Sequence, residues 1–101
     1  MNQIFGIPRQ ESLAQRLTDA CFANVVHFAN SGTEAVECAH KAARKDHAAN
    51  DESERIDIIG FAGSFHGRTY AAVNASGNPS HLEGFGPQLP GYIQLSIDDR
   101  W

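Results

Sequence analysis

The sequence has few basic residues, few cysteines and no long apolar run. Its 101 residues include 8 Lys and Arg against 12 Asp and Glu, which gives a net charge of −4. Because no basic cluster is present, we expect neither a nucleic-acid surface nor an electrostatic membrane anchor. No stretch of about 18 apolar residues could span a membrane, and the first residues lack the basic and apolar parts of a signal peptide. These absences predict a cytoplasmic protein.

The two cysteines and five histidines predict no disulfide framework and no metal site. Cys21 and Cys38 are too few and too far apart for either, and we expect both to be small buried side chains. The histidines lack the spacing and the carboxylate neighbours of metal ligands. A glycosylation sequon at residues 74–76 is interpreted as chance, since no secretory signal accompanies it.

The composition, 42% hydrophobic and 20% charged, is that of a globular domain. Apolar residues at helical spacing predict helices, which cover residues 10–21, 32–47 and 68–76. Apolar and β-branched runs predict strands, which cover residues 24–30, 56–62 and 92–97. The run 56–62 is typical of a strand buried on both faces, and the proline- and glycine-rich residues 77–91 are predicted to form a loop. Strands that alternate with helices predict an α/β fold with mostly parallel strands.

A first motif, Ser31-Gly32-Thr33-Glu34, opens the helix predicted over 32–47. It fits a capping box, in which the Ser31 side chain accepts a hydrogen bond from an early backbone N–H group and Glu34 reaches back. The same residues fit a phosphate site, because a glycine permits close approach and free N–H groups attract an anion. The sequence leaves both interpretations open.

A second motif, Ser64-Phe65-His66-Gly67-Arg68-Thr69, follows the strand predicted over 56–62. Open α/β sheets bind ligands at the carboxyl ends of their strands. Phe65 and His66 offer flat rings beside a small glycine, and Arg68 offers a planar fork for a carboxylate. The plainer alternative is a core phenylalanine, a turn glycine and a solvated arginine.

These two motifs, "NSGTEAVE" and "SFHGRT", are followed by "GFGPQLPGY", and together they closely resemble the acetylornithine aminotransferase family. This family is a branch of the class III pyridoxal-phosphate aminotransferases of fold type I, and the resemblance covers nearly the whole chain. It implies that Ser31, Gly32 and Thr33 hold the phosphate of pyridoxal 5'-phosphate. It further implies that Phe65 stacks on the pyridine ring with His66 beside it. Arg68 would bind the α-carboxylate of the substrate.

The chain departs from the family pattern at Val36, where the family usually has Asn, and we expect local repacking there. The family also needs a Schiff-base lysine and an acidic partner for the pyridine nitrogen. The only lysines, Lys41 and Lys45, fall on a polar helix face and are interpreted as solvated. In the family the required residues come later than position 101. Residues 1–101 are therefore expected to be one fragment of the cofactor-binding large domain, with no complete second domain.

Family topology implies that the strand 24–30 lies near one edge of a seven-stranded sheet and that 56–62 and 92–97 lie at the far side. The leading hypothesis is a segment of an enzyme that transfers an amino group from N-acetylornithine to 2-oxoglutarate in arginine biosynthesis. We expect no catalytic residue in the chain and no activity from it alone. The family implies a homodimer and a small amino-acid substrate. An alternative is a non-catalytic module that binds an anion or pairs with a second chain, and a third is an unrelated small α/β domain.

Overall fold

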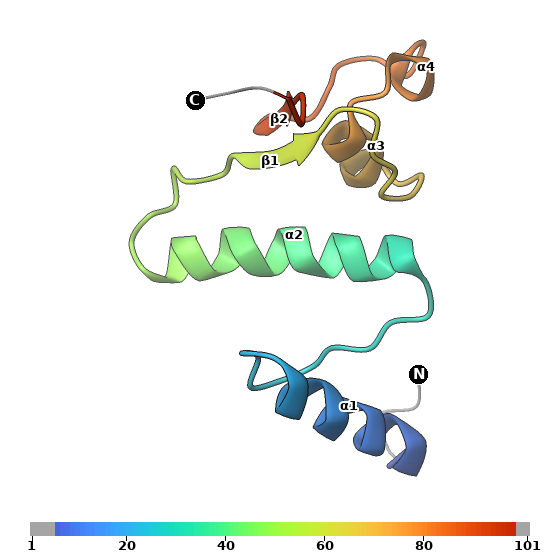
Figure 1. The fold of residues 1–101 in the computed structure, drawn as a ribbon. Helices are drawn as coiled ribbons and strands as arrows, with labels where there is room; N and C mark the ends of the chain where they lie inside the picture. Colours follow the sequence, from blue (N-terminus) through green and yellow to red (C-terminus); the bar gives the residue numbers. More distant parts are fainter. Residues whose placement is uncertain (1–5, 99–101) are drawn as a thin grey trace. The chain divides into compact units, whose positions relative to one another are not determined.

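The computed structural model describes residues 6–98, and the chain divides into two compact units between Asn30 and Ser31 (Figure 1). The first unit contains helix α1, Pro8–Ala20, which begins with the proline that the first helical turn tolerates well. Leu13 and Leu17 lie on its apolar stripe but stay 47% and 42% exposed. No residue of α1 is buried.

Two predictions for the first unit are wrong. Residues 25–29, within the strand predicted over 24–30, have no regular secondary structure. A strand requires a neighbour that shares its backbone hydrogen bonds, and no described segment pairs with these residues. Cys21 is exposed rather than buried, because no described side chain covers the end of α1.

Helix α2, Gly32–Ala49, opens the second unit and matches the predicted helix closely. Ser31 caps its first turn, and Asn50 follows its last residue. The alanines of its predicted apolar stripe are exposed: Ala35, Ala39, Ala42 and Ala43. Lys41 and Lys45 are exposed as predicted.

A parallel pair of strands follows, and it confirms the predicted α/β class. Strand β1, Ile58–Phe61, pairs with strand β2, Tyr92–Leu95, in the register that sets Ile58 beside Tyr92. Two further backbone bonds extend the ladder, from Ile58 N to Gly91 O and from Ala62 N to Leu95 O, each 2.8 Å long.

Two short helices connect the strands. Helix α3, Tyr70–Ser76, lies within the region predicted to be helical and ends at Gly77 in the left-handed conformation. Helix α4, Pro79–Leu82, lies in the region predicted to be a loop, so that prediction is wrong in part. The Asn78 side chain accepts a bond from Ser80 N and caps this helix, and Pro79 occupies its first turn.

The described core of the second unit lies between α3 and one face of the sheet. Ala72 and Ala75 are buried on α3. Gly60 brings β1 so close to α3 that an added Cβ would meet Ala75 O at 2.6 Å. On β2, Gln94 Nε2 donates to Asn74 O at 2.6 Å. Small residues and one amide thus let the helix lie directly on the strands (Figure 1).

The opposite face of the sheet is open. Ile59 is 56% exposed, Phe61 53% and Ile93 41%. The prediction that β1 is buried on both faces is therefore wrong for the described chain, in which α3 covers one face only. No helix among residues 6–98 combines the length and the apolar character that a bilayer span needs.

Candidate functional site

One pocket of the second unit brings together the start of α2 and the loop after β1. It has a volume of about 320 Å³. Its lining comprises all five predicted cofactor-binding residues and two of their neighbours: Ser31, Gly32, Thr33, Phe65, His66, Val36 and Gly67. We call it the α2 pocket. The convergence concerns position only, and the roles of these residues remain predictions.

The helix start contributes backbone donors to this pocket. Ser31 Oγ accepts a hydrogen bond from Glu34 N at 3.2 Å, so the predicted cap is present. The N–H groups of Gly32 and Thr33 come before the first intrahelical acceptor and have no partner within the helix. Capping and anion binding are therefore compatible here, since the cap uses the N–H group of Glu34 and not those of Gly32 and Thr33.

The two glycines of the pocket differ in what the fold requires. A Cβ at Gly32 would meet nothing within 4 Å, and its backbone does not adopt a positive φ. Gly67 is buried with φ of 114°, and a Cβ there would overlap the hydroxyl of Thr33. The fold itself demands glycine at 67, whereas at 32 nothing in the described chain does.

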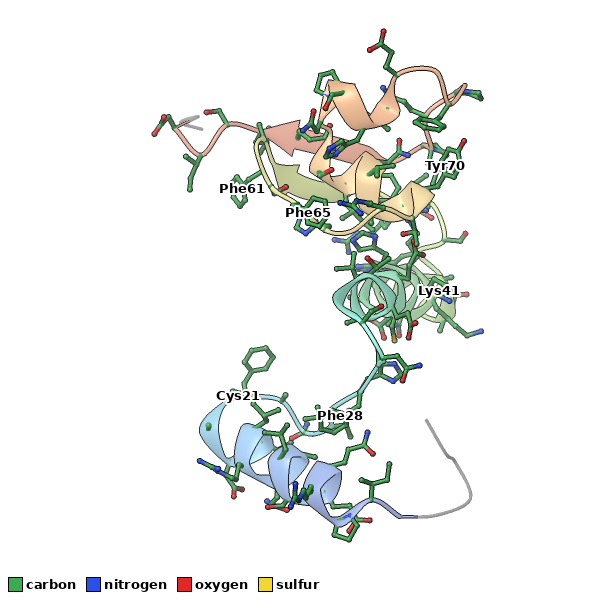
Figure 2. All side chains as sticks on the ribbon, turned by 90° about the vertical axis from the view of Figure 1, so that its right-hand side faces the viewer. Cys21, Phe28, Lys41, Phe61, Phe65 and Tyr70 are labelled. Carbon is green, nitrogen blue, oxygen red and sulfur yellow. The ribbon has the colours of Figure 1, made fainter. Side chains whose placement is uncertain are left out.

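The loop after β1 supplies the aromatic rings of the α2 pocket. Phe61 and Phe65 both project from the end of β1 and the loop that follows it (Figure 2), and the Phe65 ring is 60% exposed. Ser64 belongs to the same loop but does not line the α2 pocket, and its Oγ is buried without a hydrogen-bond partner among residues 6–98. An exposed aromatic ring and two backbone N–H groups without a partner in the helix fit a flat ligand that carries an anionic group.

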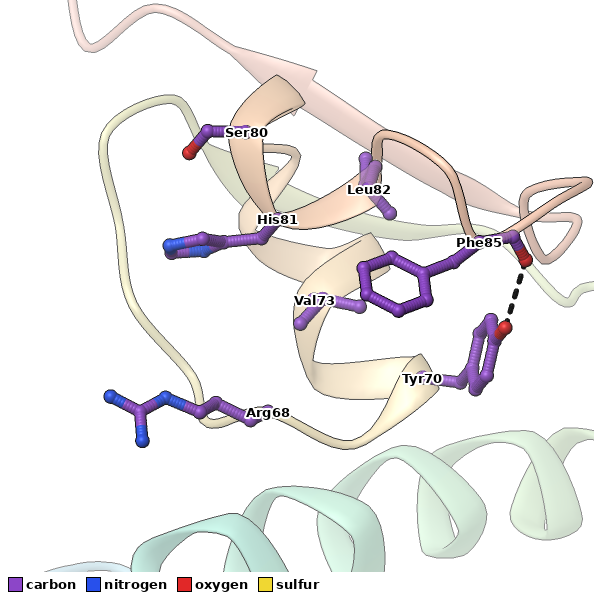
Figure 3. A pocket seen from close by; sticks show the side chains of 7 residues that line it. All are labelled: Arg68, Tyr70, Val73, Ser80, His81, Leu82 and Phe85. Atoms are coloured by element: carbon purple, nitrogen blue, oxygen red, sulfur yellow. Dashed lines mark hydrogen bonds between the residues drawn. The ribbon is translucent and has the colours of Figure 1, made fainter.

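Arg68 does not line the α2 pocket. It lines a second pocket, also of about 320 Å³, formed mainly by α3 and α4 and shown in Figure 3: Arg68, Tyr70, Val73, Ser80, His81, Leu82 and Phe85. We call it the α3 pocket. The guanidinium of Arg68 forms no hydrogen bond or ion pair with any described residue. The Tyr70 hydroxyl, in contrast, donates a 2.8 Å hydrogen bond to Phe85 O. The Phe65 and His81 rings meet edge to face at 6.3 Å, which brings the two pockets into contact.

One face of α2 carries polar side chains that contact the rest of the second unit. We call it the polar stripe, and it consists of Thr33, Glu37, His40 and Arg44. Their spacing of three or four residues aligns them along the helix. Glu37 accepts a 2.5 Å hydrogen bond from the Thr69 hydroxyl.

Arg44 fixes the other end of the polar stripe. It donates to Ile56 O and to Pro90 O, both at 3.0 Å, and its guanidinium lies 5.1 Å from the centre of the Tyr92 ring. These bonds connect α2 to the segments that enter β1 and β2. Arg44 therefore contributes to the position of the sheet relative to the α2 pocket.

His40 and Tyr92 meet in the middle of the stripe, with Tyr92 Oη 3.3 Å from His40 Nδ1. Partial burial lowers the pKa of His40. The negative charge of Glu37 raises this pKa, whereas the positive charges of His66 and Arg44 lower it further. Partial burial also raises the pKa of Tyr92. Both shifts favour the neutral forms of this pair.

Sequence reasoning missed three residues near the site. Glu37, Thr69 and His81 were assigned no role in the site. Thr69 directly follows the motif arginine, which is the one signal that could have drawn attention to it. No local pattern could reveal Glu37, since its partner lies 32 positions further along the chain.

A parallel strand pair with a pocket at the carboxyl end of β1 is the arrangement of α/β enzymes that bind ligands there. The chain belongs to the class-III aminotransferases, because the model of that family matches residues 1–101. This is a family of pyridoxal-phosphate-dependent enzymes, so the family and the fold predicted from the motifs are confirmed.

Curated relatives support this membership. The chain is 67% identical over 100 residues to acetylornithine aminotransferase 2 of Caulobacter vibrioides and 48% identical over 99 residues to acetylornithine aminotransferase of Mesorhizobium japonicum. These alignments cover 99% and 98% of this chain but 25% of each relative. The chain thus spans about a quarter of the length of the curated relatives that it matches.

Solved structures are similar in fold. An (S)-enantioselective omega-transaminase from Thermomicrobium roseum matches with a TM-score of 0.80 and 33% identity, over 91% of this chain and 21% of that one. The ornithine aminotransferase from Toxoplasma gondii matches with a TM-score of 0.80 and 27% identity, over 98% of this chain and 24% of that one. A second structure of the Toxoplasma enzyme is described as having partial occupancy of pyridoxal phosphate at its active site.

Proposed function

We propose that the chain is the phosphate-binding and ring-stacking segment of an acetylornithine-type aminotransferase. The observation that carries this proposal is the convergence of all five predicted cofactor-binding residues on the α2 pocket. Two separate stretches of sequence, 31–33 and 65–66, supply them, so the local sequence alone does not bring them together. The curated relatives named acetylornithine aminotransferase support the choice of substrate class.

In this proposal the helix start binds the phosphate of pyridoxal 5'-phosphate. The backbone N–H groups of Gly32 and Thr33 donate to its oxygens, and the helix dipole adds a favourable field. The Ser31 hydroxyl keeps its own proton to donate while its oxygen caps Glu34 N. Gly32 leaves room for close approach, which accounts for a glycine that the fold does not need.

Phe65 stacks on the pyridine ring in this proposal, and His66 lies beside it. When bound, the cofactor supplies an electron sink for amino-group transfer. Arg68 binds the α-carboxylate of the amino-acid substrate through its planar fork, a role that suits a guanidinium with no partner among residues 6–98.

The whole reaction in this proposal is amino-group transfer from N-acetylornithine to 2-oxoglutarate, as a step of arginine biosynthesis in the cytoplasm by a homodimer. Lys41 and Lys45 are exposed on α2 and do not line the α2 pocket. We therefore propose that residues 1–101 do not complete the reaction alone.

A chimera tests this assignment. The chain replaces the matching quarter of acetylornithine aminotransferase 2 from Caulobacter vibrioides, and glutamate formation from acetylornithine and 2-oxoglutarate is measured. We expect the chimera to retain the cofactor and to turn over, and the 101-residue chain to form no glutamate above the rate of free pyridoxal phosphate. A chimera that folds but binds no cofactor contradicts the proposal.

A second candidate is a module that pairs with another polypeptide. The open face of the sheet favours it, because Ile59, Phe61 and Ile93 remain exposed there. Mixing the chain with the remaining three-quarters of the Caulobacter relative, expressed separately, distinguishes the two. Restored glutamate formation supports pairing, and no association by gel filtration contradicts it.

A further inference from the structure

The residues on both sides of Arg68 are fixed to α2. On one side, the buried Gly67 backbone lies against the hydroxyl of Thr33. On the other side, the Thr69 hydroxyl donates to Glu37 Oε1 at 2.5 Å. Thr33 and Glu37 are one helical turn apart on the polar stripe, so two side chains on one face of α2 contact both ends of the segment 67–69.

The side chain of Arg68, between these two contacts, is not held by any described residue. Arg68 is exposed, lines the α3 pocket and forms no hydrogen bond or ion pair with any described residue. Its backbone is thus held from both neighbours, while its guanidinium stays free for a ligand. A backbone that is already fixed adds no further loss of backbone entropy when the fork binds a carboxylate, so only the side chain has to become ordered.

We propose that Glu37 and Thr69 are a positioning pair, which fixes the backbone of Arg68 so that its guanidinium is directed at the substrate carboxylate. This inference rests on the proposed function for the role of Arg68, but not for the geometry of the pair. Thr69 also precedes α3 as its N-cap residue, yet its side chain forms no capping bond. Its hydroxyl serves the bond to Glu37 instead.

Four single variants of the chimera separate the hydrogen bond from the side-chain volume. Thr69→Val and Glu37→Leu remove the donor or the acceptor at similar size, whereas Thr69→Ser and Glu37→Gln keep them. We expect the first two to raise KM for acetylornithine about tenfold, the loss typical of a hydrogen bond to a carboxylate. We expect kcat and the absorbance of bound cofactor to stay within about twofold, because ground-state binding of the carboxylate is what weakens.

The conservative variants and a matched control complete this series. Thr69→Ser and Glu37→Gln should retain the KM of the parent chimera, and so should Asp46→Leu, which removes an exposed carboxylate elsewhere on α2. The double variant Glu37→Leu with Thr69→Val should raise KM no further than either single change, because both remove one bond. An unchanged KM in the first two variants overturns the inference. If cofactor binding and kcat fall by as much as KM rises, the bond has a merely structural role, and this result also overturns the inference.

A second measurement remains decisive if the chimera proves inactive and the proposed function fails. Nitrogen-15 relaxation in the full 101-residue chain reports the mobility of the Arg68 backbone directly. Thr69→Val and Glu37→Leu should lower its order parameter, while Thr69→Ser and Asp46→Leu should leave it unchanged. If the Arg68 backbone is equally rigid in all of them, the pair does not position it and the inference is wrong.

Discussion

The hydroxyl of Thr33 occupies the space beside the Gly67 backbone that any larger residue at position 67 would need for its side chain. This contact joins the start of α2 to the loop after β1, and the α2 pocket is lined from both sides of it. The shape of the α2 pocket therefore depends on the contact between the Gly67 backbone and the Thr33 hydroxyl.

Gly67→Ala should lower the free energy of unfolding by about 2 kcal/mol or more, because backbone strain at positive φ adds to steric overlap with Thr33. Chemical denaturation monitored by circular dichroism measures the loss. Gly63→Ala is the matched control, since Gly63 has φ of 80° but nothing within 4 Å of an added Cβ. Equal losses in the two variants would mean that strain alone acts and that the contact with Thr33 is unimportant.

Gly32→Val should separate stability from cofactor binding. An added side chain meets nothing in the described chain, so we expect a stability change below about 1 kcal/mol. In the chimera the same change should weaken retention of pyridoxal phosphate about tenfold or more, measured by absorbance after dialysis. Ala39→Val, an exposed change on the same helix, controls for the branched side chain. A Gly32→Val chimera that keeps its cofactor would show that position 32 only starts a helix.

Arg68→Ala should have the complementary effect in the chimera. Cofactor absorbance should persist, while KM for acetylornithine rises on the order of tenfold to a hundredfold, since charged hydrogen bonds to the carboxylate are lost. Arg68→Lys should recover part of the loss, because lysine keeps the charge without the planar fork. Arg16→Ala, on the exposed surface of α1, should leave KM unchanged. An unaltered KM in Arg68→Ala contradicts the assignment of the carboxylate site.

Acidification should destabilise the second unit through His40. The folded chain holds a proton on this ring less tightly than the unfolded chain, because partial burial lowers its pKa from 6.5. The contribution of His40 to stability is therefore complete above pH 6.5 and is lost as the pH falls from 6.5 through the lowered pKa. Melting temperatures measured across this window should depend less on pH in His40→Phe than in the parent. His27→Phe is the control, and an identical pH dependence in His40→Phe would contradict the prediction.

Local sequence patterns predicted the helices and strands whose formation is determined mainly by the residues within them. Alanine-rich periodicity and the Ser31 cap predicted α2, and its observed bounds differ only at the last turn. The apolar runs predicted β1 and β2, each somewhat longer than observed. The strand predicted over 24–30 failed for the opposite reason, because a strand exists only with a partner. Helix α4 was missed since a single capped turn gives no hydrophobic period.

The candidate site was predictable as a set of residues but not as a geometry. Two motifs predicted Ser31–Thr33 and Phe65–His66, which the α2 pocket brings together. That Arg68 would line a different pocket could not be inferred, because adjacent residues in a loop can point in different directions. The bond between Glu37 and Thr69 joins two polar residues that lie far apart in the sequence. Apolar periodicity therefore gives no sign of it.

The parallel pairing of β1 with β2 also sets the order of events in time. Helices α2 and α3 close their hydrogen bonds within their own residues, whereas β1 must wait for a partner beyond α3 and α4. Among residues 6–98, β1 has no strand to pair with until β2 has been made, so Ile59 and Phe61 stay outside a ladder for longer than α2 stays outside its helix. Closing a long loop before any ladder bond forms slows this step. In pulse-labelled refolding, the amides of the sheet should gain protection after those of α2.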